Sequence, residues 1–144
     1  MSLSLALSQV LADATVMYHR VHGFHWNVMG SDFPQWHSKF EEIYGDVYES
    51  LDPIAENIRK VGGIAPFRLS DLLSLSSCVD DAVADYDWRT LVTSLYATNQ
   101  CVLTSLNSAF QIANATNEQG VANFLAERID NHQKWAWQLS ASLS

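Results

Sequence analysis

Cysteine is scarce in this chain. Cys78 and Cys101 are the only cysteines among 144 residues, and they form no CxxC pair of the kind that binds a metal ion. With no framework of paired cysteines, we expect both to be free, small core residues of an intracellular protein.

Basic residues are also few. The chain has 8 Lys and Arg against 16 Asp and Glu, a net charge of −8 and a pI near 4.8. Binding to the nucleic-acid backbone needs Lys and Arg, so direct DNA binding is disfavoured. An acidic chain is instead suited to collecting cations.

Long apolar runs are absent. No stretch approaches the roughly 18 apolar residues of a membrane span. The first residues carry no basic segment, and polar residues interrupt their apolar pattern, so they predict a helix start rather than a signal peptide. We expect a cytoplasmic protein with no membrane partner.

Strand signals, internal repeats and low-complexity tracts are missing too, whereas helical periodicity runs through the chain. Apolar residues at three- and four-residue spacings predict a first helix from Leu3 to about Trp26. A second helix is expected over residues 34–61, with Ser31 or Asp32 as its N-cap, Pro53 inside it and Gly62-Gly63 at its end.

The remaining chain predicts a long crossover followed by two more helices. The crossover covers residues 64–80 and is expected to hold a short helix at Ser70–Leu75. Asp80 or Asp81 is the expected cap of a third long helix that includes Val83 and Tyr86. A polar turn at residues 114–120 precedes a fourth helix. The resulting fold class is all-α, with one ferritin-like domain over residues 1–144. It is a four-helix bundle with a short helix in the crossover between the second and third predicted helices.

Candidate metal ligands lie on the second predicted helix. At 100° per residue, His37, Glu41, Asp52 and Glu56 fall at about 0°, 40°, 60° and 100° around its axis. They form two i, i+4 pairs on one face. Oxygen and imidazole ligands together suit iron, manganese or zinc.

The rise of a helix separates these two pairs. His37 and Asp52 are 15 residues apart, or roughly 22 Å along the axis, so one helix cannot bring both to one ion. Two antiparallel copies related by a two-fold axis can do so. We therefore predict a site with His25 and His37 from one subunit and Asp52 and Glu56 from its partner.

Other interpretations of these residues stay open. Acid pairs on helices are usually solvated, and single histidines usually have a structural role, so a bundle without a metal site is possible. His19 and His22 are expected to be structural, because successive 100° increments spread these histidines over about 240°, away from the face of His25.

Three motifs resemble the Dps family of miniferritins. They read HWNVMG, FxxxHxxFEExY and LDPIAENIRKVGG, and they stand in the family's order and spacing. The match is close across residues 18–63 and extends more loosely along the whole chain, including HQKWAWQL. The resemblance implies that His25, His37, Asp52 and Glu56 are the intersubunit ferroxidase ligands. Glu41 falls where the family usually has an Asp that supports the second iron.

The same resemblance implies a function and an assembly. Members of the Dps family form hollow dodecamers built from two-fold dimers. They oxidise Fe(II) with hydrogen peroxide, store ferric mineral and so limit oxidative damage, and the resemblance implies the same for this chain. It implies an iron cofactor, for which zinc or manganese could substitute. It also implies iron entry through acidic pores, for which Glu118 and Glu127 are the candidates.

Two other functions would need features that this sequence lacks. The alternative is a DNA-compacting nucleoid protein, but the first basic residue is Arg20 and none follows Lys134, so a Lys/Arg-rich terminal tail is missing. A di-iron site inside one bundle would use Glu-x-x-His pairs, and no glutamate here has a histidine three residues later.

Overall fold

The computed structural model describes residues 1–144 as five α-helices without a strand, which confirms the all-α prediction. None of the helices is both long and apolar enough to cross a membrane. The helices are α1 (Leu3–Asn27), α2 (Phe33–Lys60), α3 (Leu69–Leu75), α4 (Trp88–Ala115) and α5 (Gln119–Leu143).

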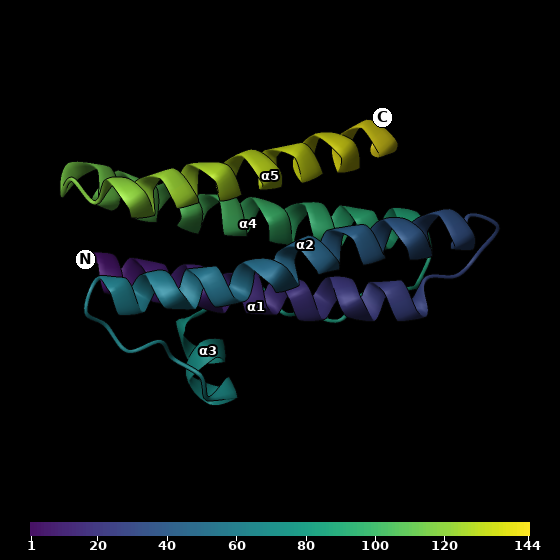
Figure 1. The fold of residues 1–144 in the computed structure, drawn as a ribbon. Helices are drawn as coiled ribbons and strands as arrows, with labels where there is room; N and C mark the ends of the chain where they lie inside the picture. The colour runs from purple at the N-terminus through teal and green to yellow at the C-terminus, as the bar shows by residue number, and fades with distance from the viewer.

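The four long helices form two antiparallel hairpins that pack side by side (Figure 1). The first hairpin is α1–α2 and the second is α4–α5, while α1 also contacts α4. The connection from α2 to α4 runs back along the bundle and carries α3, which packs outside it on α1. One long crossover between two hairpins is the topology expected for a ferritin-like bundle.

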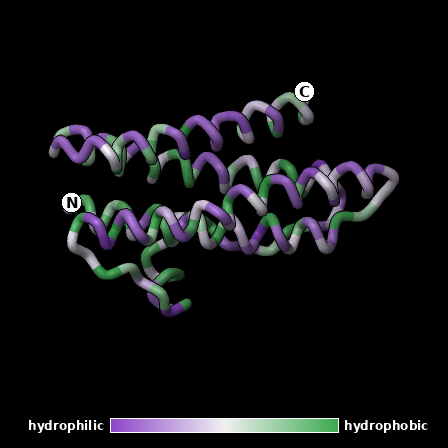
Figure 2. Tube along the Cα trace, viewed as in Figure 1, coloured by the Kyte–Doolittle hydropathy of each residue, from purple (hydrophilic) through white to green (hydrophobic).

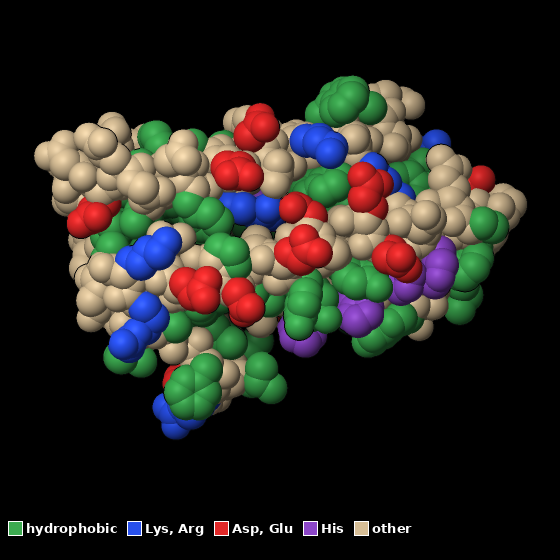
Figure 3. Space-filling view, in the orientation of Figure 1, with side chains coloured by type: hydrophobic (Ala, Val, Ile, Leu, Met, Phe, Trp, Pro, Cys, Tyr) green, Lys and Arg blue, Asp and Glu red, His purple; other side chains and the backbone are tan.

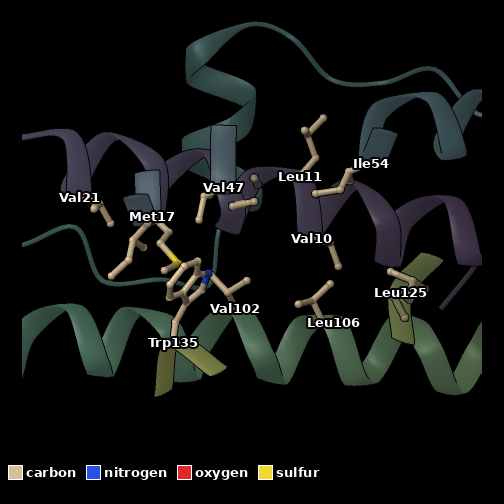
Figure 4. Packing of buried hydrophobic residues seen from close by; sticks show 14 of the residues in the cluster. Val10, Leu11, Met17, Val21, Val47, Ile54, Val102, Leu106, Leu125 and Trp135 are labelled. Atoms are coloured by element: carbon tan, nitrogen blue, oxygen red, sulfur yellow. The ribbon is translucent and has the colours of Figure 1, made fainter. Parts of the chain in front are cut away.

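Apolar residues at helical spacing build the core. Each long helix alternates polar and apolar faces (Figure 2), and the apolar faces meet in a cluster of 30 buried residues. At its centre Met17, Val47, Val102, Leu106 and Trp135 converge from four helices (Figure 4). Burying one such aliphatic side chain stabilises the fold by about 1.5–3 kcal/mol.

The helix ends follow local chemistry. The Ser2 hydroxyl accepts a hydrogen bond from the Leu5 N–H and caps α1. After α2, Gly62 has a φ of +92° and the Gly63 N–H donates to the Ile58 carbonyl at 3.0 Å, a Schellman-type ending. This confirms the predicted end of the second helix.

The predicted start of the third long helix is wrong. Helix α4 begins at Trp88, and its N-cap is Asp87, whose carboxylate accepts from the Arg89 N–H. Asp80 and Asp81 instead lie outside any helix and face the buried Arg20 guanidinium, at 3.1 and 3.2 Å. The buried Arg20 guanidinium needs oxygen acceptors nearby. Its contacts with Asp80 and Asp81 keep these two residues in the crossover rather than in α4.

Candidate metal centre

His25 and His37 meet where α1 ends and α2 begins. The His25 Nδ1 lies 2.6 Å from the His37 carbonyl oxygen, and the His37 Nδ1 lies 2.8 Å from the His25 carbonyl oxygen. A carbonyl oxygen only accepts, so each Nδ1 carries the hydrogen and donates. Each Nε2 is then left with a lone pair, which is the form of imidazole that binds a metal ion.

Aromatic rings hold both imidazoles in place. The two histidine rings stack with centroids 3.8 Å apart and planes 16° apart. Phe33 stacks on His37 at 4.8 Å, and Tyr44 contacts His25 edge-on at 5.2 Å. His25 is buried, so its ring has little freedom to turn away from this orientation.

Glu41 adds an oxygen ligand beside this pair. Its Oε1 lies 3.9 Å from the His25 Nε2, and its side chain is 64% exposed. The donor atoms of His25, His37 and Glu41 do not all come within 4.8 Å of one another. The three residues therefore offer one side of a metal site and leave its other side open.

The second predicted pair lies farther along α2. Asp52 and Glu56 are both exposed and belong to the same unbroken 28-residue helix as His37. Along a continuous helix the 15-residue separation remains roughly 22 Å. The fold of one chain thus brings His25, His37 and Glu41 together and keeps Asp52 and Glu56 apart from them.

The expectation that His22 lies away from His25 is wrong. Their ring centroids are 6.3 Å apart, and His22 stacks on Tyr44 at 4.3 Å. A three-residue step is 300°, which equals 60° backward, so residues i and i+3 are neighbours on a helix. Histidines accordingly gather along one edge of the molecule beside acidic side chains (Figure 3).

The surroundings of His22 favour its neutral imidazole. Its pKa is lowered by desolvation and then by the charges that His25 and His19 would carry. A neutral imidazole can stack on Tyr44 without repelling a cation bound nearby. Trp26, 4.4 Å from the His22 ring, is 63% exposed.

Phe33 and Tyr44 pack against the site histidines, although the sequence pattern does not mark them as site residues. Aromatic residues at helical spacing usually belong to the core, so spacing alone does not single them out. The signal that could have found them is the FxxxH and ExxY pattern around His37 and Glu41, which puts an aromatic ring one turn from each ligand.

One pore candidate, Glu118, lies at the opposite end of the bundle from the paired histidines. Glu118 immediately precedes α5 and shares a shallow hollow with Glu56 and Lys60 at the end of α2. Glu127 is exposed on α5. A pore at a symmetry axis needs several subunits, so their role stays a prediction.

The chain is similar to known proteins over almost its whole length. The chain matches the ferritin-like domain model over residues 4–144. It is 29% identical over 138 residues to DNA protection during starvation protein 2 of Bacillus anthracis, covering 96% of this chain and 94% of that protein. It is 28% identical to general stress protein 20U of Bacillus subtilis, covering 96% and 94%.

Solved structures show the same fold. The Dps protein of Vibrio cholerae, described as a ferritin-like diiron-carboxylate protein, superposes with a TM-score of 0.93 at 28% identity, covering 99% of this chain and 89% of that one. The Dps of Staphylococcus aureus gives 0.92 at 29% identity, covering 99% and 95%. The chain belongs to the ferritin-like family and, within it, to the Dps miniferritins.

Proposed function

We propose that this protein is a ferroxidase that oxidises Fe(II) with hydrogen peroxide and stores the ferric product in a hollow oligomer, a dodecamer built from two-fold dimers. The observation that carries the proposal is the reciprocal pair of Nδ1–carbonyl hydrogen bonds between His25 and His37. They leave the Nε2 of each ring free to bind a metal ion, and the Glu41 carboxylate lies 3.9 Å from the His25 Nε2.

The open side of the site suggests how it is completed. Two α2 helices packed antiparallel across a two-fold axis would bring Asp52 and Glu56 of one subunit to His25 and His37 of the other. The carboxylates would offset the charge of two Fe(II) ions, which enter as substrate. Zinc and manganese would compete for the same nitrogen and oxygen ligands.

Two neighbouring irons make the chemistry safer. Two Fe(II), one hydrogen peroxide and two protons give two Fe(III) and two waters, so the peroxide receives both electrons together. A single Fe(II) would deliver one electron and release a hydroxyl radical. Glu41 is exposed, so Fe(II) can reach the site from solvent, whereas His25 is buried on the inner side of the site.

Protection of DNA would follow from this chemistry rather than from direct contact. The Bacillus anthracis relative is named for DNA protection. Here 16 acidic residues outnumber 8 Lys and Arg, so each subunit repels the phosphate backbone. We propose that removal of Fe(II) and peroxide is the protective activity.

The test pairs two single variants, His37→Ala and Asp52→Ala. Each alone should abolish the fast phase of Fe(II) oxidation by peroxide, followed by stopped-flow absorbance. Dissociated and reassembled as an equal mixture, they should recover about a quarter of the sites. Half of the random dimers are mixed, and one of the two sites in a mixed dimer is intact.

The control is Glu49→Ala, which removes an exposed acid of α2 that is outside the proposed ligand set. It should keep the fast phase. Recovery in the mixture at no more than the level of the separate variants would rule out a site shared between subunits. A normal fast phase in both single variants would rule out the ligand assignment.

A further inference from the structure

The two cysteines meet beside Asp13, roughly three turns along α1 from His25. Cys78 follows α3 in the crossover and Cys101 lies in α4, and their sulfur atoms and the Asp13 carboxylate lie within 4.8 Å of one another. Both cysteines are free thiols. The expectation that they are core residues is only partly met, because each is half-buried.

Asp13 is fully buried and held by hydrogen bonds rather than by a cation. Its Oδ1 accepts from the Ser76 hydroxyl and the Ser77 N–H, each at 2.7 Å. Its Oδ2 accepts from the Ser77 hydroxyl at 2.7 Å. These donors stabilise the carboxylate while its negative charge stays beside the thiols.

The hydrogen bond from Ser77 assigns the proton of Cys101. A serine hydroxyl has one hydrogen, and that of Ser77 is donated to Asp13. The contact of 3.3 Å between the Ser77 Oγ and the Cys101 Sγ therefore has the thiol as donor. Cys101, Ser77 and Asp13 form a chain along which the thiol proton can pass to the carboxylate.

A surface hollow leads to one of the two thiols. A hollow of about 490 Å³ lies between residues 77–83 and α4, and Cys101 and Ser77 line it. Cys78 does not line it. Burial raises the pKa of the Cys78 thiol, and the neighbouring Cys101 and Asp13 raise it further. Cys78 is thus a neutral thiol, which disfavours a thiolate metal site and suits an uncharged disulfide.

We propose that Cys101 and Cys78 form a peroxide-oxidisable dithiol site in which Cys101 reacts first and Cys78 resolves it. Hydrogen peroxide enters the hollow, the Cys101 proton passes through Ser77 to Asp13, and the sulfur attacks one peroxide oxygen. The S–O bond forms as the O–O bond breaks, and the departing hydroxide takes the proton back from Asp13, which gives a sulfenic acid and water. The Cys78 sulfur then displaces that oxygen, the Cys78 proton passes to the departing hydroxide to give a second water, and the disulfide closes.

This site consumes one peroxide and oxidises two thiols without iron, so it is independent of the proposed ferroxidase activity. The disulfide would join the crossover to α4 and close a loop between residues 78 and 101. Loop closure restricts the unfolded chain, so the oxidised protein should also unfold at a higher temperature.

The experiment treats the metal-free full chain with equimolar hydrogen peroxide in the presence of an iron chelator. Free thiols are then alkylated and the intact mass and a non-reducing peptide map are recorded. Both thiols should be lost to alkylation, with a link between Cys78 and Cys101 of one chain that a reductant reverses. Two alkylatable thiols after treatment, or a link between two chains, would overturn the proposal.

Variants separate the roles. In Cys78→Ser the Cys101 sulfenic acid should persist and be captured by a dimedone-type probe. Ser77→Ala should slow thiol loss about tenfold and move its pH–rate profile to higher pH, because the proton relay is cut. Ser77→Thr should restore both. The matched control is Thr93→Ala, which removes another hydroxyl that lines the hollow but donates to the Arg89 carbonyl and takes no part in the relay. Equal slowing in both alanine variants would refute the relay.

Discussion

At the scale of single residues, a cluster of polar side chains buried in the bundle has well-defined protonation states. Arg128 donates to both oxygens of Asp46, at 2.8 and 3.0 Å, and to the His132 Nε2 at 3.1 Å. The His132 Nδ1 therefore carries the hydrogen and donates to the Asn99 Oδ1 at 2.8 Å. Burial, followed by the Arg128 charge, lowers the pKa of His132 to about 3.

This pKa predicts an acid-sensitive fold. The unfolded chain binds a proton at His132 below about pH 6.5, while the folded chain binds it only near pH 3. Stability should therefore fall as pH decreases through this window, by about 1.4 kcal/mol per pH unit from this residue. Thermal unfolding between pH 4 and 7 should show a shallower pH dependence in His132→Gln than in the native chain. Parallel curves would contradict the assignment.

Asp46, in the same buried cluster, is stabilised in its charged form, whereas His132 is stabilised in its neutral form. Burial alone would raise the pKa of Asp46, but the hydrogen bonds and charge of Arg128 and the Trp135 N–H lower it below its usual value. Asp46 thus stays ionised and compensates the buried Arg128. The network connects α2, which carries most of the candidate metal ligands, with α4 and α5.

At the scale of secondary-structure elements, the end of α2 is set by its contact with α1. A methyl group on Gly63 would collide with the Ser4 hydroxyl and meet Ile58. A side chain at this position would therefore force Ser4 and Ile58 to move. From this end of α2, residues 64–68 lead into α3, outside the bundle.

Two alanine variants test this contact. Gly63→Ala should lower stability by about 1–3 kcal/mol through overpacking. Gly45→Ala is the matched control, because a methyl group at this helical position has nothing within 4 Å. It should raise stability by about 0.5–1 kcal/mol. Thermal unfolding of both variants measures the difference, and an unchanged melting temperature for Gly63→Ala would disprove close packing.

For the whole molecule, a subunit with an open metal site also has exposed apolar side chains. Leu69 and Leu73, at 68% and 59% exposure, lie four residues apart on one face of α3. Phe67, just before α3, is 81% exposed. An apolar surface of this kind favours burial against a second subunit, as the proposed shared site requires.

The assembly prediction follows from this surface. Leu69→Asp with Leu73→Asp should reduce the mass in solution, measured by light scattering, and should remove fast Fe(II) oxidation at the same time. Leu69→Met with Leu73→Met keeps the apolar surface and should preserve both. A double aspartate variant that is fully assembled would show that α3 is not at an interface.

The sequence by itself determined the helical bundle and the residue types of the site. Helical periodicity is a local property, so the bounds of the first two helices and of α3 were predictable to within a residue or two. The separation of His37 from Asp52 follows from helix rise alone, so the sequence by itself predicts that one chain holds only part of the site.

Only the tertiary structure decided which atoms face one another. The tautomers of His25 and His37 depend on backbone carbonyls across a turn, and the start of α4 depends on a buried arginine in another helix. The meeting of Cys78 with Cys101 depends on the path of the crossover. Such contacts join residues far apart in the chain, and periodicity carries no information about them.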